Sequence, residues 1–241
     1  MSAATGFRFL SSALLVAIAL FLLVSPVWGQ QTFVSRYDLF TGYTYLNSPK
    51  VNLPEHGFHT QFGVRPKTWY SLGFDYSVST GDLLLTPDLL PDALQQTLGA
   101  QLGQLAAHGL LPPGYKLAVK AGSTTQTFAT GPQLSWRRWR PITLFLRPSI
   151  GAIHETATPK PADPIATAIV QGLAPKGKKT DWTAFYGFGG GIDFNCSKRF
   201  ALRVQADLVR DHLFNDILKD PRGTVRFSVG PAFNLGRNIL E

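Results

Sequence analysis

The chain has 241 residues, of which 44% are hydrophobic and 16% charged, and its formal net charge is +8. This length allows one or two domains, and the single cysteine, Cys196, excludes an intrachain disulfide. The basic residues are spread over expected turns and loops, so we expect no nucleic-acid partner and favour attraction to outer-membrane lipids, including lipopolysaccharide.

The N-terminal segment has the features of a secretory signal peptide. Arg8 precedes twelve consecutive apolar residues at positions 13–24, and the small residues Val27 and Gly29 follow. This order predicts a signal peptide over residues 1–29 and a mature chain over 30–241. The apolar run is shorter than the roughly 20 residues of a membrane-spanning helix, although an uncleaved N-terminal anchor remains an alternative.

After this segment the chain shows eight stretches in which apolar and polar residues alternate. In residues 69–79, for example, Tyr70, Leu72 and Phe74 share one face, whereas Ser71 and Gly73 share the other. This period of two predicts strands with two different faces. Each stretch has the length, roughly 9–13 residues, at which a tilted strand crosses a bilayer. The predicted strands cover residues 35–46, 57–65, 69–79, 124–136, 141–153, 182–194, 199–210 and 223–235.

The predicted connections alternate between short and long. Residues 66–68, 137–140 and 195–198 form three short turns. The other connections are longer: residues 47–56, the two large insertions 80–123 and 154–181, and residues 211–222. Bacterial transmembrane barrels show this asymmetry, with tight turns on the periplasmic side and long loops outside.

The polar faces of the predicted strands carry charged residues that point into a barrel if the apolar faces meet lipid. An eight-stranded barrel is just wide enough for its interior to be filled by side chains, so small and polar residues fit inside better than many aromatic ones. A two-sheet sandwich with an apolar interior is the alternative. The predicted polar network of the lumen comprises His59, Asp75, Arg147, Asp193, Arg203, Asp207 and Arg226.

A buried charge needs a partner, and folding the hairpins about their turns places Asp207 opposite Arg226 and His59 opposite Asp75. We expect these pairs to hold the lumen together. A gated or proton-linked conduction path is the alternative.

The two large insertions each contain a predicted helix. In the first, covering residues 87–107, Thr86 is the expected N-cap and leucines recur at helical spacing from Leu90 onward. This leucine stripe either packs on the barrel rim or docks an extracellular partner. The second helix begins at Asp163 and Pro164, and Lys176, Lys178 and Lys179 follow it. These lysines are either solvated or meet anionic sugar-lipids.

The sequence contains no recognisable catalytic, cofactor or metal motif. His56, His154 and His212 lie near loop ends, and Glu155 and Asp211 are neighbours of the last two. Neither a G-x-S-x-G nucleophile motif nor an H-E-x-x-H metal motif accompanies them. We therefore expect no enzyme, no cofactor and no metal, with a lipid-modifying hydrolase or acyltransferase at the rim, using His154 or His212, as the less favoured alternative.

Three blocks of sequence carry a resemblance to a known family: "YDLFTGYTYL" from Tyr37, "YGFGGGIDFNCSKRFALRVQADLV" from Tyr186 and "VRFSVGPAFNLG" from Val225. The chain resembles the eight-stranded OmpA/OmpX-like outer-membrane β-barrel domains. The resemblance implies a structural, adhesive or narrow-pore role. Two departures are the ending "GRNILE" in place of a terminal aromatic residue, and no following peptidoglycan-binding domain.

The sequence therefore predicts an all-β fold: an eight-stranded antiparallel transmembrane β-barrel with helical insertions in long extracellular loops. We expect it in the bacterial outer membrane, as a non-enzymatic protein with a structural or surface-interaction role. A narrow channel for small solutes or ions is the alternative.

Overall fold

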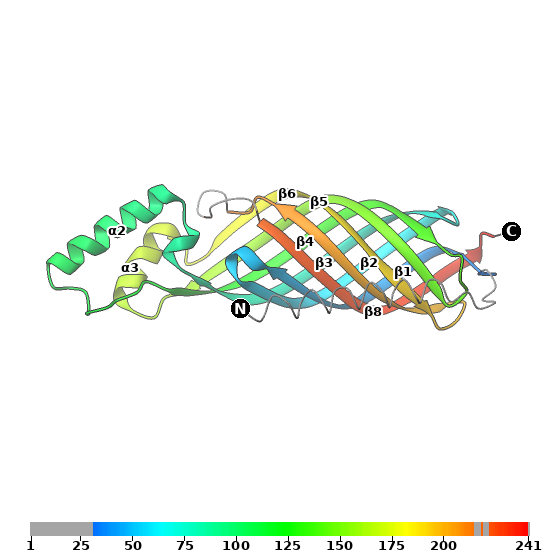
Figure 1. The fold of residues 1–241 in the computed structure, drawn as a ribbon, viewed down its shortest axis with the longest axis horizontal. Helices are drawn as coiled ribbons and strands as arrows, with labels where there is room; N and C mark the ends of the chain where they lie inside the picture. Colours follow the sequence, from blue (N-terminus) through cyan, green and yellow to red (C-terminus); the bar gives the residue numbers. More distant parts are fainter. Residues whose placement is uncertain (1–30, 215–217, 219–221, 241) are drawn as a thin grey trace, which may run out of the picture.

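The computed structural model describes residues 31–214, 218 and 222–240, so the predicted signal peptide, residues 1–29, lies outside the described residues. Eight strands form a closed barrel in which each strand pairs with its neighbours in sequence (Figure 1). All pairs are antiparallel, and β8 closes the barrel by pairing with β1, from Tyr37 opposite Leu235 to Asn47 opposite Val225. The predicted fold class is confirmed.

The strands are β1 (Ser35–Ser48), β2 (Leu53–Lys67), β3 (Tyr70–Leu85), β4 (Val119–Trp136), β5 (Ile142–Lys160), β6 (Lys179–Asn195), β7 (Phe200–Asp211) and β8 (Arg222–Asn238). At the short-turn end the predicted strand ends agree with these bounds to within three residues. At the other end the strands run further than predicted, so the two insertions shrink from 80–123 and 154–181 to residues 86–118 and 161–178.

The connection between β1 and β2 is also shorter than expected. It holds only the 3-10 turn η1 (Pro49–Val51) and Asn52, whose φ of 48° is left-handed. The expected strict alternation of short and long connections is therefore wrong at this position. Residues 47–56 lack the alternation of large apolar and polar residues that identifies a membrane strand, although most of them still pair in the sheet.

We call the half of the barrel near the short turns the lower barrel and the half near the long loops the upper barrel. In the upper barrel, where the strands run further than predicted, the inward and outward faces differ in polarity from those of the lower barrel. In the lower part of β3, Leu72 and Phe74 are exposed while Asp75 is buried; near its upper end Leu83 is buried while Asp82 is exposed. This inversion is the arrangement of a soluble protein, in which apolar residues leave water. Where we expect a polar lumen, the upper interior is mixed: the carboxylates of Glu55 and Glu155 are buried there beside a cluster of apolar residues. This cluster includes Leu53, Leu83, Ala121, Ile153, Phe185, Val209 and Leu213.

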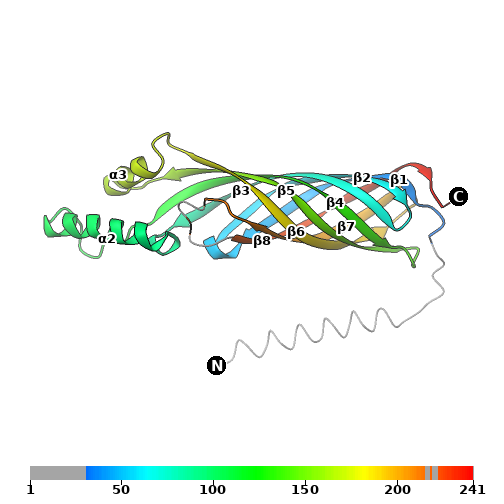
Figure 2. The same ribbon diagram turned by 90° about the horizontal axis from the view of Figure 1, so that it is seen from above.

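Two helices project from the long-loop end, opposite the C-terminus (Figures 1 and 2). The helix predicted for residues 87–107 is divided into the 3-10 turn η2 (Pro87–Leu89) and α2 (Asp92–Ala107), because Pro91 interrupts it as the N-cap of α2. Helix α3 (Pro164–Leu173) begins as predicted, with the Asp163 carboxylate accepting a hydrogen bond of 2.8 Å from the Ala166 amide.

Within the described part of the chain, none of the helices combines the length and apolar character needed to cross a bilayer.

The glycines of the "GFGGG" block make room for side chains inside the barrel. A Cβ atom added to Gly189 would lie 1.9 Å from Oδ1 of Asp207 and 2.9 Å from the Ala206 carbonyl oxygen. A Cβ atom on Gly191 would lie 2.7 Å from the Phe145 ring. Small residues at these positions are therefore needed because the lumen is already filled.

We expect Gly189→Ala to lower the free energy of unfolding by about 1–3 kcal/mol, since overpacking forces neighbouring groups to shift. Urea unfolding in detergent micelles measures this change. Gly99→Ala in α2 is the matched control, because a Cβ there meets no atom within 4 Å. Equal stability of the two variants would contradict the filled interior.

Candidate functional site

The lower lumen is crossed by ion pairs centred on Asp75. One oxygen of this carboxylate, Oδ2, accepts from Arg147 Nη1 at 2.9 Å, from Arg226 Nη2 at 3.2 Å and from His59 Nε2 at 3.3 Å. Arg226 also donates to Asp207, with Nη2 and Oδ2 2.9 Å apart. These five side chains come from β2, β3, β5, β7 and β8, so the contacts connect opposite walls of the barrel.

A second group of ion pairs lies closer to the short-turn end. Arg203 donates two hydrogen bonds to Asp193, of 2.6 and 2.9 Å. The Arg203 and Arg65 guanidinium groups each lie 3.3 Å from the Asp38 carboxylate. The pair between Arg203 and Asp193 is bidentate, which is the strong form of an arginine–carboxylate ion pair. It fixes the position of the Asp193 carboxylate against β7.

The charges of the two groups balance. Four arginines (Arg65, Arg147, Arg203 and Arg226) face four aspartates (Asp38, Asp75, Asp193 and Asp207), and all eight side chains are buried. Burying a charge is costly unless it is paired and hydrogen-bonded. The pairing therefore closes the lumen with side chains and leaves it without net charge from these groups.

The structure brings all seven residues of the predicted lumen network into these two groups. Sequence reasoning missed two further members, Asp38 and Arg65. Asp38 was missed because β1 carries aromatic residues on both faces. Arg65 was missed although it is the last residue of the predicted strand 57–65, directly before the short turn 66–68. One feature of the sequence does indicate Asp38. It lies two residues before Phe40, so both side chains are on the same face of β1, and both are buried.

Three of the buried side chains are arranged like a hydrolase triad. Ser228 Oγ lies 3.0 Å from His59 Nδ1, and His59 Nε2 lies 3.3 Å from Asp75. The sequence predicts the contact between His59 and Asp75 but not the one with Ser228, which lies far from them in the chain. All three side chains are buried, and Asp75 also accepts from two arginines. A substrate has no described route to the serine, so the geometry favours a structural role.

The histidines considered at the rim do not form an active site with their neighbours. His154 stacks on Trp182 with ring centroids 4.5 Å apart, whereas Glu155 points inward and accepts a hydrogen bond from Ser123. His56 contacts the Tyr43 hydroxyl. Among the described residues, no three His, Cys, Asp or Glu side chains are grouped so that they could hold a metal.

We expect Arg226→Met to destabilise the barrel by about 3–5 kcal/mol, since it leaves the buried Asp207 carboxylate without its arginine and removes one of the two arginines that face Asp75. The midpoint of thermal unfolding in detergent measures the loss. Lys160→Met is the matched control, because Lys160 forms an exposed pair with Asp82 at 3.4 Å, and exposed pairs contribute about 0–1 kcal/mol. A change at Arg226 no larger than at Lys160 would exclude a stabilising network.

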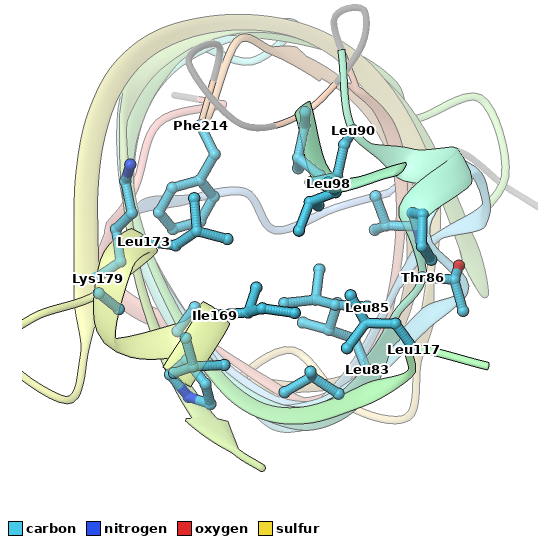
Figure 3. A pocket seen from close by; sticks show the side chains of 18 of the residues that line it. Leu83, Leu85, Thr86, Leu90, Leu98, Leu117, Ile169, Leu173, Lys179 and Phe214 are labelled. Carbon is cyan, nitrogen blue, oxygen red and sulfur yellow. The ribbon is translucent and has the colours of Figure 1, made fainter. Parts of the chain in front are cut away.

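Above the ion pairs, the upper barrel opens into an apolar cavity that we call the vestibule. Figure 3 shows leucine, isoleucine and phenylalanine side chains from several elements turned toward its centre. Only Thr86, Glu155 and Lys179 are polar among its lining residues. The apolar lining comprises Val51, Leu83, Leu85, Pro87, Leu90, Leu98, Leu117, Val119, Ala157, Pro159, Ile169, Val170, Leu173, Ala174, Phe214 and Leu218.

The two large insertions, residues 86–118 and 161–178, together form part of the wall of the vestibule. Leu98 of α2 and Ala166 of α3 are buried in one cluster, so the leucine stripe of α2 packs on α3 and the strand ends. The Tyr115 hydroxyl donates to the Asp163 carboxylate at 3.1 Å, which ties the chain after α2 to the start of α3. Burial and this hydrogen bond raise the pKa of the Tyr115 phenol.

The vestibule has a volume of about 100 Å³. An apolar cavity of about 150 Å³ can stay dry and bind benzene, so this space suits a small apolar group rather than water. It lies directly above the paired charges, which form no part of its lining. The site therefore combines an apolar chamber that faces the loops with ion pairs that cross the lumen.

Comparison with solved structures reveals the same architecture. Neisserial surface protein A (NspA) is 7% identical, with a TM-score of 0.51 over 83% of this chain and 96% of that protein. Ail of Yersinia pestis is 10% identical, with a TM-score of 0.47 over 83% of this chain and 98% of that one. OprG of Pseudomonas aeruginosa is 7% identical, with a TM-score of 0.45 over 86% and 99%. Neither a protein-family model nor a curated protein matches the chain.

Proposed function

We propose that this chain, which has the fold of the eight-stranded outer-membrane β-barrels, is a sealed, non-enzymatic barrel that presents a loop module at the cell surface. The paired charges across the lumen are the observation that carries this proposal. A pore needs a continuous path for water and ions through the lumen. Here arginine and aspartate side chains from opposite walls contact one another across the lumen and occupy such a path. The role is then structural or one of surface interaction.

The outer surface of the lower barrel supports a place in a membrane. Large apolar side chains stay exposed around it, among them Phe74, Ile150, Phe188 and Leu208. A belt of this size on a soluble protein would drive association, but in a bilayer it meets hydrocarbon. Aromatic rings gather near the upper edge of this belt, where the Phe128 ring contacts Tyr76 on one side and Trp182 on the other. Aromatic rings of this kind favour the headgroup level of a bilayer. The fold and this belt together favour the outer membrane.

The planar-bilayer experiment tests the sealed lumen. We expect the purified barrel to carry no steady ion current, because no water-filled path crosses the network around Asp75. The triple variant Asp75→Ala, Arg147→Ala, Arg226→Ala is the positive control, since it removes three side chains from the same level. Resistance to protease verifies that both proteins have inserted. Regular current steps from the unmodified barrel would instead support the narrow channel.

The vestibule favours a second function: we propose that it binds a small apolar molecule or the alkyl tail of an amphiphile. Its lining is apolar except for Thr86, Glu155 and Lys179, and its volume of about 100 Å³ suits a small group. The location at the long-loop end makes the surface-interaction role specific, because the ligand would enter between the loops. A predicted partner at the loop helix 87–107 would have to use the face of α2 that is turned away from α3.

Leu98→Trp should abolish this binding by filling the vestibule. We expect the unmodified barrel in nanodiscs to bind benzene above the lipid background, and this variant to bind it at least tenfold more weakly. Leu110→Trp adds the same ring at a position that is 63% exposed and should bind normally. Equal binding by both variants would exclude the vestibule as the site.

A further inference from the structure

The short-turn end of the barrel is strongly basic. Its three turns carry Lys67, then Arg137, Arg138 and Arg140, then Lys198 and Arg199. Arg36 and Arg237 flank them at the start of β1 and the end of β8. No Asp or Glu occurs in the described stretches 31–37, 66–69, 137–141, 195–199 and 236–240. Basic residues occur at both ends of the barrel, as expected, but only at this end do the described stretches hold no acid among them.

The opposite end of the barrel does not share this bias. There, exposed lysines such as Lys120 and Lys160 alternate with exposed acids such as Asp82 and Asp88. Because like charges repel, eight cations without acids at one end weaken the folded state unless an anion meets them. The asymmetry indicates that this end meets an anionic surface, whereas the loop end does not require one.

Tryptophans locate the basic end relative to the membrane. Trp69 is 53% exposed and Trp136 is 49% exposed, and both lie where strands meet the short turns. Tryptophan rings favour the headgroup level of a bilayer. The Lys67 ammonium lies 5.7 Å from the centre of the Trp69 ring, so it is held at the same level. The basic side chains of the turns therefore lie where lipid phosphates lie.

A polar pocket lies between these turns. It has a volume of about 120 Å³, and Arg137, Arg140 and Lys198 line it together with Asn195 and Ser197. Arg137 donates from Nε to the Thr68 carbonyl oxygen at 2.9 Å. Its Nη2 atom is buried and has no hydrogen-bond partner among the described residues. Arg140 and Lys198, which line the same pocket, are exposed and can reach an anion oxygen, and guanidinium groups match phosphate geometry.

We propose that the basic end is a docking surface for anionic phospholipids of the adjoining leaflet, with the lipid phosphate seated in the pocket formed by Arg137, Arg140 and Lys198. The neighbouring tryptophans favour a lipid over a soluble phosphate, because they place the pocket at the membrane surface. This proposal is independent of whether the lumen conducts and of whether the vestibule binds a ligand.

Binding of short-chain lipids to the complete barrel in detergent tests the proposal. We expect dihexanoyl phosphatidylglycerol to change the tryptophan fluorescence with saturation, whereas dihexanoyl phosphatidylcholine does not saturate. Arg140→Gln combined with Lys198→Gln should weaken the phosphatidylglycerol binding about thirtyfold, given the roughly 1 kcal/mol that each basic residue near an anionic membrane surface contributes. The matched control, Lys176→Gln with Lys178→Gln, removes the same charge at the loop end and should bind as the unmodified barrel does.

Two results would overturn the proposal. Equal weakening by the two double variants would show that net charge, and not this surface, governs the lipid binding. Inorganic phosphate that saturates the site as tightly as the lipid would assign the pocket to a soluble anion. Heat-modifiable gel mobility verifies that each variant is folded before it is compared.

Discussion

The lipid around the barrel cannot solvate a charge, and this constraint explains much of the structure. The arginines and aspartates of the lower strands point inward, because outside they would face hydrocarbon. Once inside, each must find a partner of opposite sign, and the interior has room only for side chains that interlock. Gly189 is small because Asp207 occupies the space opposite, and Asp207 is fixed by Arg226. The same requirement that places the charges inside therefore also blocks the lumen.

Above the level of the lipid the constraint no longer applies, and the strands follow the rule for water. Leu83 turns inward and Asp82 turns outward within the same strand whose lower part exposes Phe74 and buries Asp75. The chain thus combines a lower barrel with an apolar outer surface and an upper barrel with a cluster of buried apolar residues. Some residues of this cluster, such as Leu83 and Phe214, also line the vestibule. The two parts are suited to different roles in the function proposed above. The paired charges of the lower lumen would resist the passage of solutes, whereas the apolar vestibule would accommodate a ligand.

The sequence was sufficient for the strands in the lipid-facing part, because there a period of two is enforced on both faces. It also identified the contacts of Asp75 and Asp207, since each lies near its partner across a hairpin. It failed where the pattern changes. The run Leu83–Leu85 has no alternation, and the upper ends of β3 and β4 were therefore assigned to a loop. The Ser228–His59 contact and the vestibule depend on residues distant in the chain, which no local pattern connects.

The upward extension of the strands also determines how far the helices stand from the membrane. Residues 79–85 continue β3 past the inversion, which adds about 20 Å along the strand at about 3.3 Å per residue. Even with the tilt of a barrel strand, this distance exceeds the thickness of a phosphate layer. In the outer-membrane placement proposed above, the mouth of the vestibule would stand above the lipid headgroups, within reach of molecules that never touch the lipid.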